Sequence, residues 1–224
     1  MMNKKKVFLF FILAISLNNL FAQNIVNKDY KFQVAFVPQY LIAHGIRMDF
    51  EYHLKPNKHI LLFSPQFYYD KNRADYGSSA YYEEDHYDLL KGYGIGLHHK
   101  IVIHTLNNNT WQIYFAYGGE YARFNIDFQN WEWVKYTEDG LEYIKYDLVD
   151  VKQNINRYRF DTYLGFQYNY AQVLFIDFYL GLGGIYSDSS MNPAYATAKF
   201  EFKMYDYAFT GLYLPIGFRF GFRF

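Results

Sequence analysis

The last thirteen residues, LYLPIGFRFGFRF (212–224), decide the fold. Apolar side chains occupy every second position from Leu212 to Phe224, and Arg219 and Arg223 stand between them. A period of two is the mark of a β-strand with two unlike faces. A water-soluble domain that ended on such a stripe would carry a strand edge that invites aggregation. The pattern therefore predicts a closing strand whose apolar face is covered, and lipid would cover it.

The N-terminal segment 1–22 predicts export. Three lysines at 4–6 precede an apolar run, 7–17, and Ala22 offers a small residue for cleavage. About eleven apolar residues are too few for a helix that spans a bilayer, which needs roughly 20. We expect 1–22 to be a cleaved signal peptide and 23–224 to be a single domain.

The composition narrows the class of protein. Aromatic residues make up 23% of the chain, yet the mean hydropathy is −0.24, so apolar and polar positions must be finely interleaved. After the signal no uninterrupted apolar stretch approaches the length of a membrane helix, which excludes a membrane helix bundle. The formal net charge is zero, which argues against nucleic acid as a partner. The chain has no cysteine, so disulfides cannot stabilise it.

Eight segments of the mature chain alternate with a period of two. The clearest is 45–54, where Ile46 and Met48 alternate with Arg47 and Asp49. The sequence Glu-Asp-Gly at 138–140 predicts a hairpin turn, so the fifth and sixth strands should form one tall hairpin. The expected strands cover about 31–41, 45–54, 59–70, 89–104, 111–138, 141–168, 174–183 and 200–224, with a loop at 187–195.

The connections between these strands differ in length at the two ends. Those after the second, fourth and sixth strands are short, and those after the third, fifth and seventh are long. This split is typical of transmembrane barrels, which have short periplasmic turns and long outer loops. The predicted fold is all-β: an eight-stranded antiparallel up-and-down transmembrane β-barrel with short periplasmic turns and longer extracellular loops.

The signal ending Leu20-Phe21-Ala22, the amphipathic strands and the alternating aromatic C-terminus resemble the small outer-membrane β-barrel proteins of Gram-negative bacteria, in the broad OmpA/OmpX-like and OmpW-like class. The resemblance covers essentially all of 23–224. It implies a place in the outer membrane, contact with its lipids and lipopolysaccharide, and a terminal strand that the barrel-assembly machinery reads. The residues that would carry this assembly signal are Phe218, Phe220, Phe222 and Phe224. The resemblance does not specify an activity, because the class includes structural proteins, adhesins, channels and lipid-modifying enzymes.

A barrel in lipid should be apolar outside and polar inside. Aromatic residues near the strand ends favour this orientation, since such rings gather at membrane interfaces. They are Tyr40, Tyr52, Tyr69, Trp111, Tyr121, Tyr168 and Tyr170. The interior would then hold a nearly balanced set of charges, which we expect to pair with one another and to fill the lumen, so that a water-filled pore is disfavoured. This interior polar network comprises Arg47, Asp49, Glu51, His53, Lys100, Glu120, Arg157, Arg159, Asp161, Asp177, Arg219 and Arg223.

The chemistry-bearing residues form no convincing catalytic or metal motif. His98 and His99 cannot share a metal ion from one strand, because neighbouring side chains point to opposite faces. Ser187, Ser189 and Ser190 lie near Asp188 and could include a nucleophile, but loop serines usually only turn the chain. The sequence therefore predicts no catalytic site, no cofactor and no metal site.

The tip of the tall hairpin is rich in aromatic rings. Trp131, Trp133, Tyr136 and Tyr143 are either an interaction surface for an external partner or a contact with lipopolysaccharide. The main hypothesis is a non-enzymatic outer-membrane barrel that supports the envelope and presents its loops outward. Two alternatives remain open: a lipid-modifying barrel enzyme acting on lipopolysaccharide or phospholipid, and a narrow conduit for small apolar solutes.

Overall fold

The computed structural model describes residues 30–55, 58–71, 87–106, 110–170 and 173–224. The expected signal peptide lies outside these residues. Strands dominate the described chain, and one short 3-10 helix, η1 (Pro38–Leu41), interrupts them. The strands are β1 (Phe32–Phe36), β2 (Gly45–Lys55), β3 (His59–Asp70), β4 (Leu89–Leu106), β5 (Trp111–Glu138), β6 (Leu141–Tyr170), β7 (Leu174–Asn192), β8 (Gly211–Tyr213) and β9 (Ile216–Arg223). In the part of the chain that is described, no helix has the length and apolar character needed to cross a membrane.

The strands form one antiparallel sheet that closes into a ring. Each strand from β1 to β7 pairs with its neighbour in sequence, and β9 pairs with both β7 and β1. The ring is completed at the C-terminus, where the Phe224 amide donates to the Phe32 carbonyl at 2.8 Å. The prediction of an all-β antiparallel sheet, closed by pairing of its last strand with its first, is confirmed.

Several predicted strand boundaries are wrong. The first strand ends at Phe36 because Pro38 begins η1, and Tyr40 in η1 points into the ring instead of joining an aromatic girdle. Strand β7 continues to Asn192, through most of the expected loop at 187–195, because its extension pairs with 152–157 of β6. The expected last strand is broken into β8 and β9 around Leu214 and Pro215, and 200–210 is loop.

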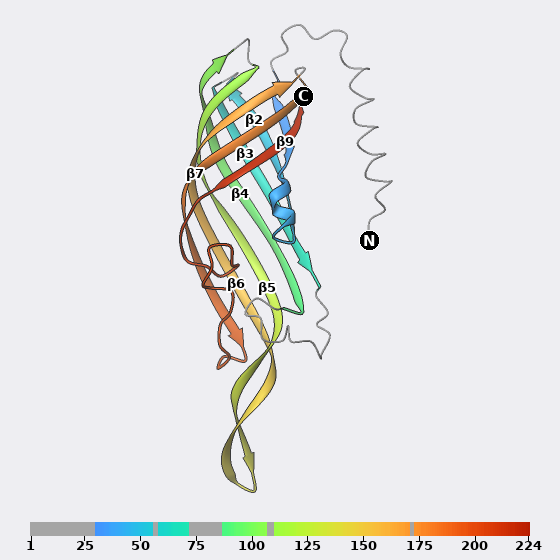
Figure 1. Cartoon of the computed structure of the whole chain (residues 1–224), viewed down its shortest axis with the longest axis vertical. Coiled ribbons are helices and arrows are strands. Elements are labelled where there is room, and N and C mark those ends of the chain that lie inside the picture. Colours follow the sequence, from blue (N-terminus) through green and yellow to red (C-terminus); the bar gives the residue numbers. More distant parts are fainter. Residues whose placement is uncertain (1–29, 56–57, 72–86, 107–109, 171–172) are drawn as a thin grey trace, which may run out of the picture.

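The two ends of the ring differ as the sequence predicts. Strands β2, β4 and β6 end, and β3, β5 and β7 begin, at the end of the ring that holds the C-terminus, with only three or four residues between each pair (Figure 1). At the other end, the β5–β6 hairpin projects beyond the remaining strands. Asp139 and Gly140 turn this hairpin with φ of 51° and 77°, the left-handed conformation that a two-residue hairpin turn requires.

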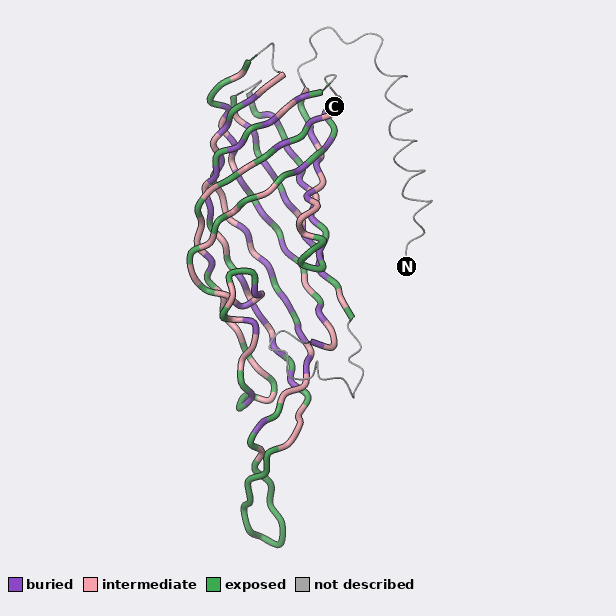
Figure 2. Tube along the Cα trace, in the orientation of Figure 1, coloured by how far each residue is buried: buried purple, intermediate pink, exposed green. Residues whose placement is uncertain are grey.

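A row of three tyrosines divides the ring into two parts. Tyr121, Tyr158 and Tyr186 are register partners on β5, β6 and β7, and their rings lie 5.3 and 6.3 Å apart in sequence order. We call these three residues the tyrosine row. The part of the ring between this row and the end that holds the C-terminus is called the inner part, and the part between the row and the hairpin tip is called the outer part. On these strands the inner part exposes apolar side chains on its outside, and buried and exposed residues alternate along it (Figure 2).

Beyond the tyrosine row the two faces exchange character. Arg123 and Asn125 point outward on β5, whereas Phe124, Ile126 and Phe128 point inward and are buried. The loop 193–210, which we call the docked loop, folds onto this apolar inner surface. It contributes buried Ala196, Phe200 and Ala208 to a hydrophobic core that also contains Val151 and Ile155 of β6. The outer part is therefore built like a water-soluble domain, with apolar residues inside.

Tyr207 ties the docked loop to the rest of this outer core. Its ring lies 5.0 Å from that of Phe124, and its hydroxyl donates to the Ala43 carbonyl at 3.2 Å. Burial raises the pKa of Tyr207 to about 12. The hydroxyl therefore stays protonated, and remains a hydrogen-bond donor, at any ordinary pH.

Candidate functional site

The structure places every residue of the predicted interior network on the inner face of the ring. All of them are buried except Arg159, which is partly exposed. They come from six strands, because strands β2, β4, β5, β6, β7 and β9 each direct alternate side chains inward. The network includes an innermost group, an outer group, His53 beside Gln33, and two arginines that have no carboxylate partner among the described residues.

The innermost group surrounds Arg219 of β9. Its guanidinium lies 2.9 Å from Asp49, 2.8 Å from Glu51 and 2.7 Å from Asp177. Lys100 reaches the same cluster, with its Nζ 3.3 Å from both Glu51 and Asp177. All five side chains are at most 1% exposed. Buried charges are tolerated only when they are paired and hydrogen-bonded, and this cluster meets that condition.

Uncharged side chains complete the innermost group. Lys100 donates to the Gln167 side-chain oxygen at 2.7 Å, and the Tyr114 hydroxyl donates to Asp177 at 2.6 Å. Tyr114 fits because its register partner is Gly165, where an added Cβ would lie 2.0 Å from the Tyr114 ring. These groups fill the cross-section of the ring, as expected for a closed sheet of eight strand positions.

The outer group is organised by Arg47 and Glu120. Arg47 pairs with Asp49 at 2.6 Å and with Glu120 at 2.7 Å. The second Glu120 oxygen pairs with Arg159 and accepts from Gln66 at 2.8 Å. Both arginines also donate to the hydroxyl of Tyr40, at 2.8 and 2.9 Å, so η1 is anchored inside the ring by its tyrosine.

His98 and Asp161 form a second pair beside this group. The His98 Nε2 atom lies 2.9 Å from Asp161, whose other oxygen accepts from Tyr213. Oxygen and nitrogen atoms of His98, Asp161 and Glu120 approach within 4.8 Å of one another, the spacing of a possible metal site. However, both Glu120 oxygens already bind arginines, and nearby cations oppose a further positive charge. The arrangement favours ion pairing over a metal ion.

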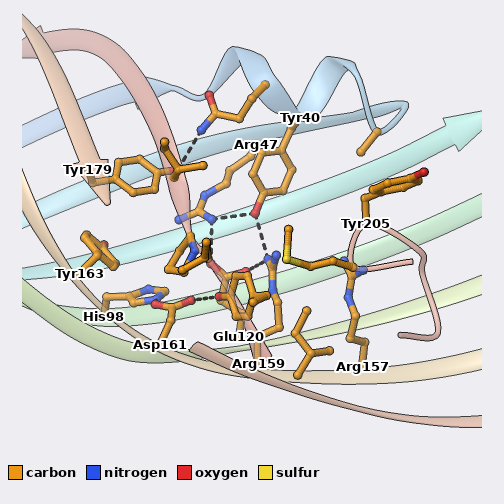
Figure 3. A pocket seen from close by; sticks show the side chains of 18 of the residues that line it. Tyr40, Arg47, His98, Glu120, Arg157, Arg159, Asp161, Tyr163, Tyr179 and Tyr205 are labelled. Carbon is orange, nitrogen blue, oxygen red and sulfur yellow. Dashed lines mark hydrogen bonds and ion pairs between the residues drawn. The ribbon is translucent and has the colours of Figure 1, made fainter. Parts of the chain in front are cut away.

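A cavity of about 230 Å³ borders the outer group, and we call it the outer cavity. Its wall includes Arg47, Arg157, Arg159 and Arg219, several tyrosines, and the carboxylates of Asp49, Glu120 and Asp161, each of which is paired with a cation or with His98 (Figure 3). Residues 204, 205 and 207 of the docked loop also line it. In Figure 3, Arg157 and Tyr205 lie at one end of the cavity, and His98 and Tyr163 lie at the other. Asp49 and Arg219 of the innermost group line the cavity as well.

No protein-family model, no curated protein and no solved structure matches this chain.

The other residues singled out in the sequence occupy three separate places. Phe218, Phe220 and Phe222 point outward from β9, and Phe224 follows that strand. Ser187 and Ser189 hold the docked loop, because they donate to the Phe209 carbonyl and to Glu201. Within the described residues no histidine bonds either serine, so neither is set up as a nucleophile there.

The aromatic residues of the hairpin tip form two clusters instead of one surface. Trp131 and Trp133 both contact Tyr146, with ring centroids 5.5 and 5.0 Å apart. Tyr136 stacks on Tyr143 at 5.4 Å. Alternation along the two strands puts these clusters on opposite faces of the ribbon. A single partner on one face would therefore contact only half of the set named from the sequence.

Sequence reasoning missed several residues of the interior. His98 shares the inward face with Lys100, two residues away, and this alternation was the available signal. Tyr114 could have been found in the same way. Tyr40 could not, since its inward position depends on η1 replacing the end of a strand.

Proposed function

We propose that this protein is an integral outer-membrane β-barrel that spans the bilayer with its inner part, keeps its lumen closed with paired charges, and presents its outer part and hairpin at the cell surface. The observation that carries the proposal is the exchange of faces at the tyrosine row. A closed sheet whose outside is apolar on one side of a sharp boundary and polar on the other matches a bilayer edge, where tyrosine is enriched.

The height of the apolar band supports the same proposal. The segments 111–121 of β5, 158–168 of β6 and 176–186 of β7 each run eleven residues and direct no charged side chain outward. A tilted transmembrane strand needs about 9 to 11 residues. The three segments end together at the tyrosine row, so they define one band and not three unrelated apolar patches.

The charged interior supports a structural role over that of a conduit. The salt bridges around Arg219 and Lys100 cross the ring between β2, β4, β7 and β9. A solute could pass only if several buried ion pairs separated, and breaking each would leave a charge unpaired. We therefore infer a role in the envelope and in contacts made outside it, with lipids, lipopolysaccharide and the barrel-assembly machinery as partners of the wall.

Single introduced cysteines test both location and orientation, because the chain has none of its own. Glu138→Cys lies at the exposed hairpin tip and Lys58→Cys at the opposite end, in a short connection. In intact cells a membrane-impermeant maleimide should label Glu138→Cys alone. After the outer membrane is permeabilised it should label both. Labelling of Lys58→Cys in intact cells, or recovery of the protein in the soluble periplasm, would rule out the proposed arrangement.

Planar-bilayer recording separates the closed barrel from a conduit. We expect little or no steady conductance from the refolded protein. The variant Arg219→Ala, which removes the central guanidinium of the plug, serves as the comparison and should conduct more often. A large, stable open state in the unmodified protein would mean that the interior charges line water.

A further inference from the structure

Arg157 is one of the two arginines that have no carboxylate partner among the described residues, and it is the one that lines the outer cavity. Within the ring, each of the five carboxylates at 49, 51, 120, 161 and 177 pairs with another cation or with His98 and Tyr213. Arg157 takes no part in these pairs. The residue is only 7% exposed, and its buried Nε has no hydrogen-bond partner among the described residues. A buried cation without a counter-charge is costly, so an anion at this position would be bound favourably.

The surroundings of Arg157 form a site with a definite shape. Arg157 and Arg159 alternate along β6 on the same inward face, and both line the outer cavity. Arg159 is held in place by Glu120 and by the Tyr40 hydroxyl. The Arg157 guanidinium lies over the Phe124 ring, 4.6 Å from its centroid, which fixes its plane without using its hydrogen bonds.

Further aromatic rings pack around the Phe124 ring that lies under this guanidinium. Tyr68 and Tyr207 both pack on Phe124, with ring centroids 4.9 and 5.0 Å away, and Tyr40 lies 6.2 Å from Tyr68. Such walls contact an apolar or flat ligand body, while the guanidinium supplies paired donors for a carboxylate or a phosphate. The cavity of about 230 Å³ is smaller than the pockets of drug-sized ligands, so the ligand is small.

We propose that the outer cavity is a binding site for a small organic acid, whose carboxylate or phosphate is held by Arg157 with Arg159 and whose apolar body contacts the surrounding aromatic rings. The ligand is a free solute that enters from the hairpin end. Arg157 is the register partner of Ala122, one residue beyond the tyrosine row on the hairpin side. Residues of the docked loop line the same cavity. The innermost group closes the opposite route.

Arg223 provides a matched control within the same chain. It is also 7% exposed, its Nε is also buried without a hydrogen-bond partner among the described residues, and its guanidinium lies 4.6 Å from the Tyr30 ring centroid. It belongs to β9 at the opposite end of the ring and does not line the outer cavity. Substituting Arg223 therefore removes the same kind of charge without touching the proposed site.

The test is calorimetric titration of the full mature chain, refolded in a non-ionic detergent, with phenyl phosphate as the probe. Phenyl phosphate should bind at least tenfold more tightly than phenol, its uncharged counterpart. Arg157→Gln should weaken phenyl phosphate binding about tenfold or more, since a charge-assisted pair of hydrogen bonds is lost, and Arg223→Gln should leave it unchanged. Heat-dependent gel mobility checks that each variant is folded.

Three results would overturn the site. They are no binding of phenyl phosphate, equal binding of phenol, and equal loss in the two arginine variants. The comparison of phenyl phosphate with phenol needs no variant, so the proposal stays testable even if Arg157→Gln does not refold.

Discussion

Strand β5 turns alternate side chains inward along its whole length, but those side chains change in kind at Ala122. Toward the C-terminal end of the ring the inward positions include Gln112 and Glu120, and the outward ones are apolar. Just beyond Ala122, over 123–128, the inward positions are Phe124, Ile126 and Phe128, and the outward ones are Arg123, Asn125 and Asp127. The backbone pairing is the same in both parts. With lipid around the inner part and water around the outer part, as proposed above, the same backbone pairing accounts for both side-chain patterns.

The comparison implies that the two parts are stabilised by different interactions. The inner part holds charges that must stay paired, and the outer part holds an apolar core that must stay filled. Four experiments test this difference. All use the mature chain refolded in lipid vesicles, with the bilayer around the inner part as proposed above.

The largest effect should come from Arg219→Met. It leaves Asp49, Glu51 and Asp177 with one fewer cation in a site that is nearly free of water. Removing one partner of a buried ion pair costs about 3 to 5 kcal/mol, and we expect the urea midpoint of unfolding to fall accordingly. The control is Arg123→Met, an exposed arginine just beyond the tyrosine row, which should leave the midpoint unchanged. If the two variants lower the urea midpoint equally, the buried ion pairs around Arg219 do not stabilise the ring more than an exposed arginine does.

Phe200→Ala should release the docked loop without opening the ring. Phe200 is 5% exposed and packs on Tyr87, Phe128 and Tyr207. Truncating a buried phenylalanine costs about 3 kcal/mol or more. Here we expect that cost to weaken only the packing of the docked loop against the ring. The backbone amides of 193–210 should exchange hydrogen faster, and the urea midpoint for unfolding of the ring should stay unchanged. Phe202→Ala, in the same loop but 86% exposed, should change neither measurement. A global loss of stability in Phe200→Ala would contradict the division into two parts.

A pair of arginine substitutions on β6 tests the position of the boundary. Leu164→Arg places a charge on the outside of the ring near the middle of the segment 158–168, and Asn154→Arg places one on the outside beyond the tyrosine row. A lipid-facing arginine near the middle of a bilayer costs about 2 kcal/mol or more, and an interfacial one costs almost nothing. The urea midpoint should therefore fall for Leu164→Arg only. If both variants unfold at the same urea concentration, the bilayer edge does not lie at the tyrosine row.

The smallest effect should follow replacement of the hairpin tip, 134–145, by Asn-Gly. Trp133 and Tyr146 are register partners, so a two-residue turn joins them without a change of register. The tip residues are mostly exposed, and we expect no measurable shift in the urea midpoint. Any loss of binding to cells or envelope components would then report a surface role and not a folding defect. A lower midpoint would show that the tip stabilises the ring.

The sequence by itself determined the strands and their faces, since a period of two is a local property that no long-range contact has to supply. Arg47, Asp49 and Glu51 could be placed inside the ring from alternation alone, and the terminal phenylalanines outside it. Local signals also gave the hairpin turn at Asp139-Gly140.

Tertiary structure alone decided how the interior charges pair and where an extended run stops being a strand. Arg219 meets Asp49 across 170 residues of chain, and alternation says nothing about which strands face each other across the lumen. Tyr40 turns inward because η1 ends the strand early, and the residues from Ser187 to Asn192 are strand because β6 offers them partners. Arg157 has no carboxylate partner in the described part of the chain for the same reason: pairing depends on distances through the ring, and these exist only once the sheet has closed.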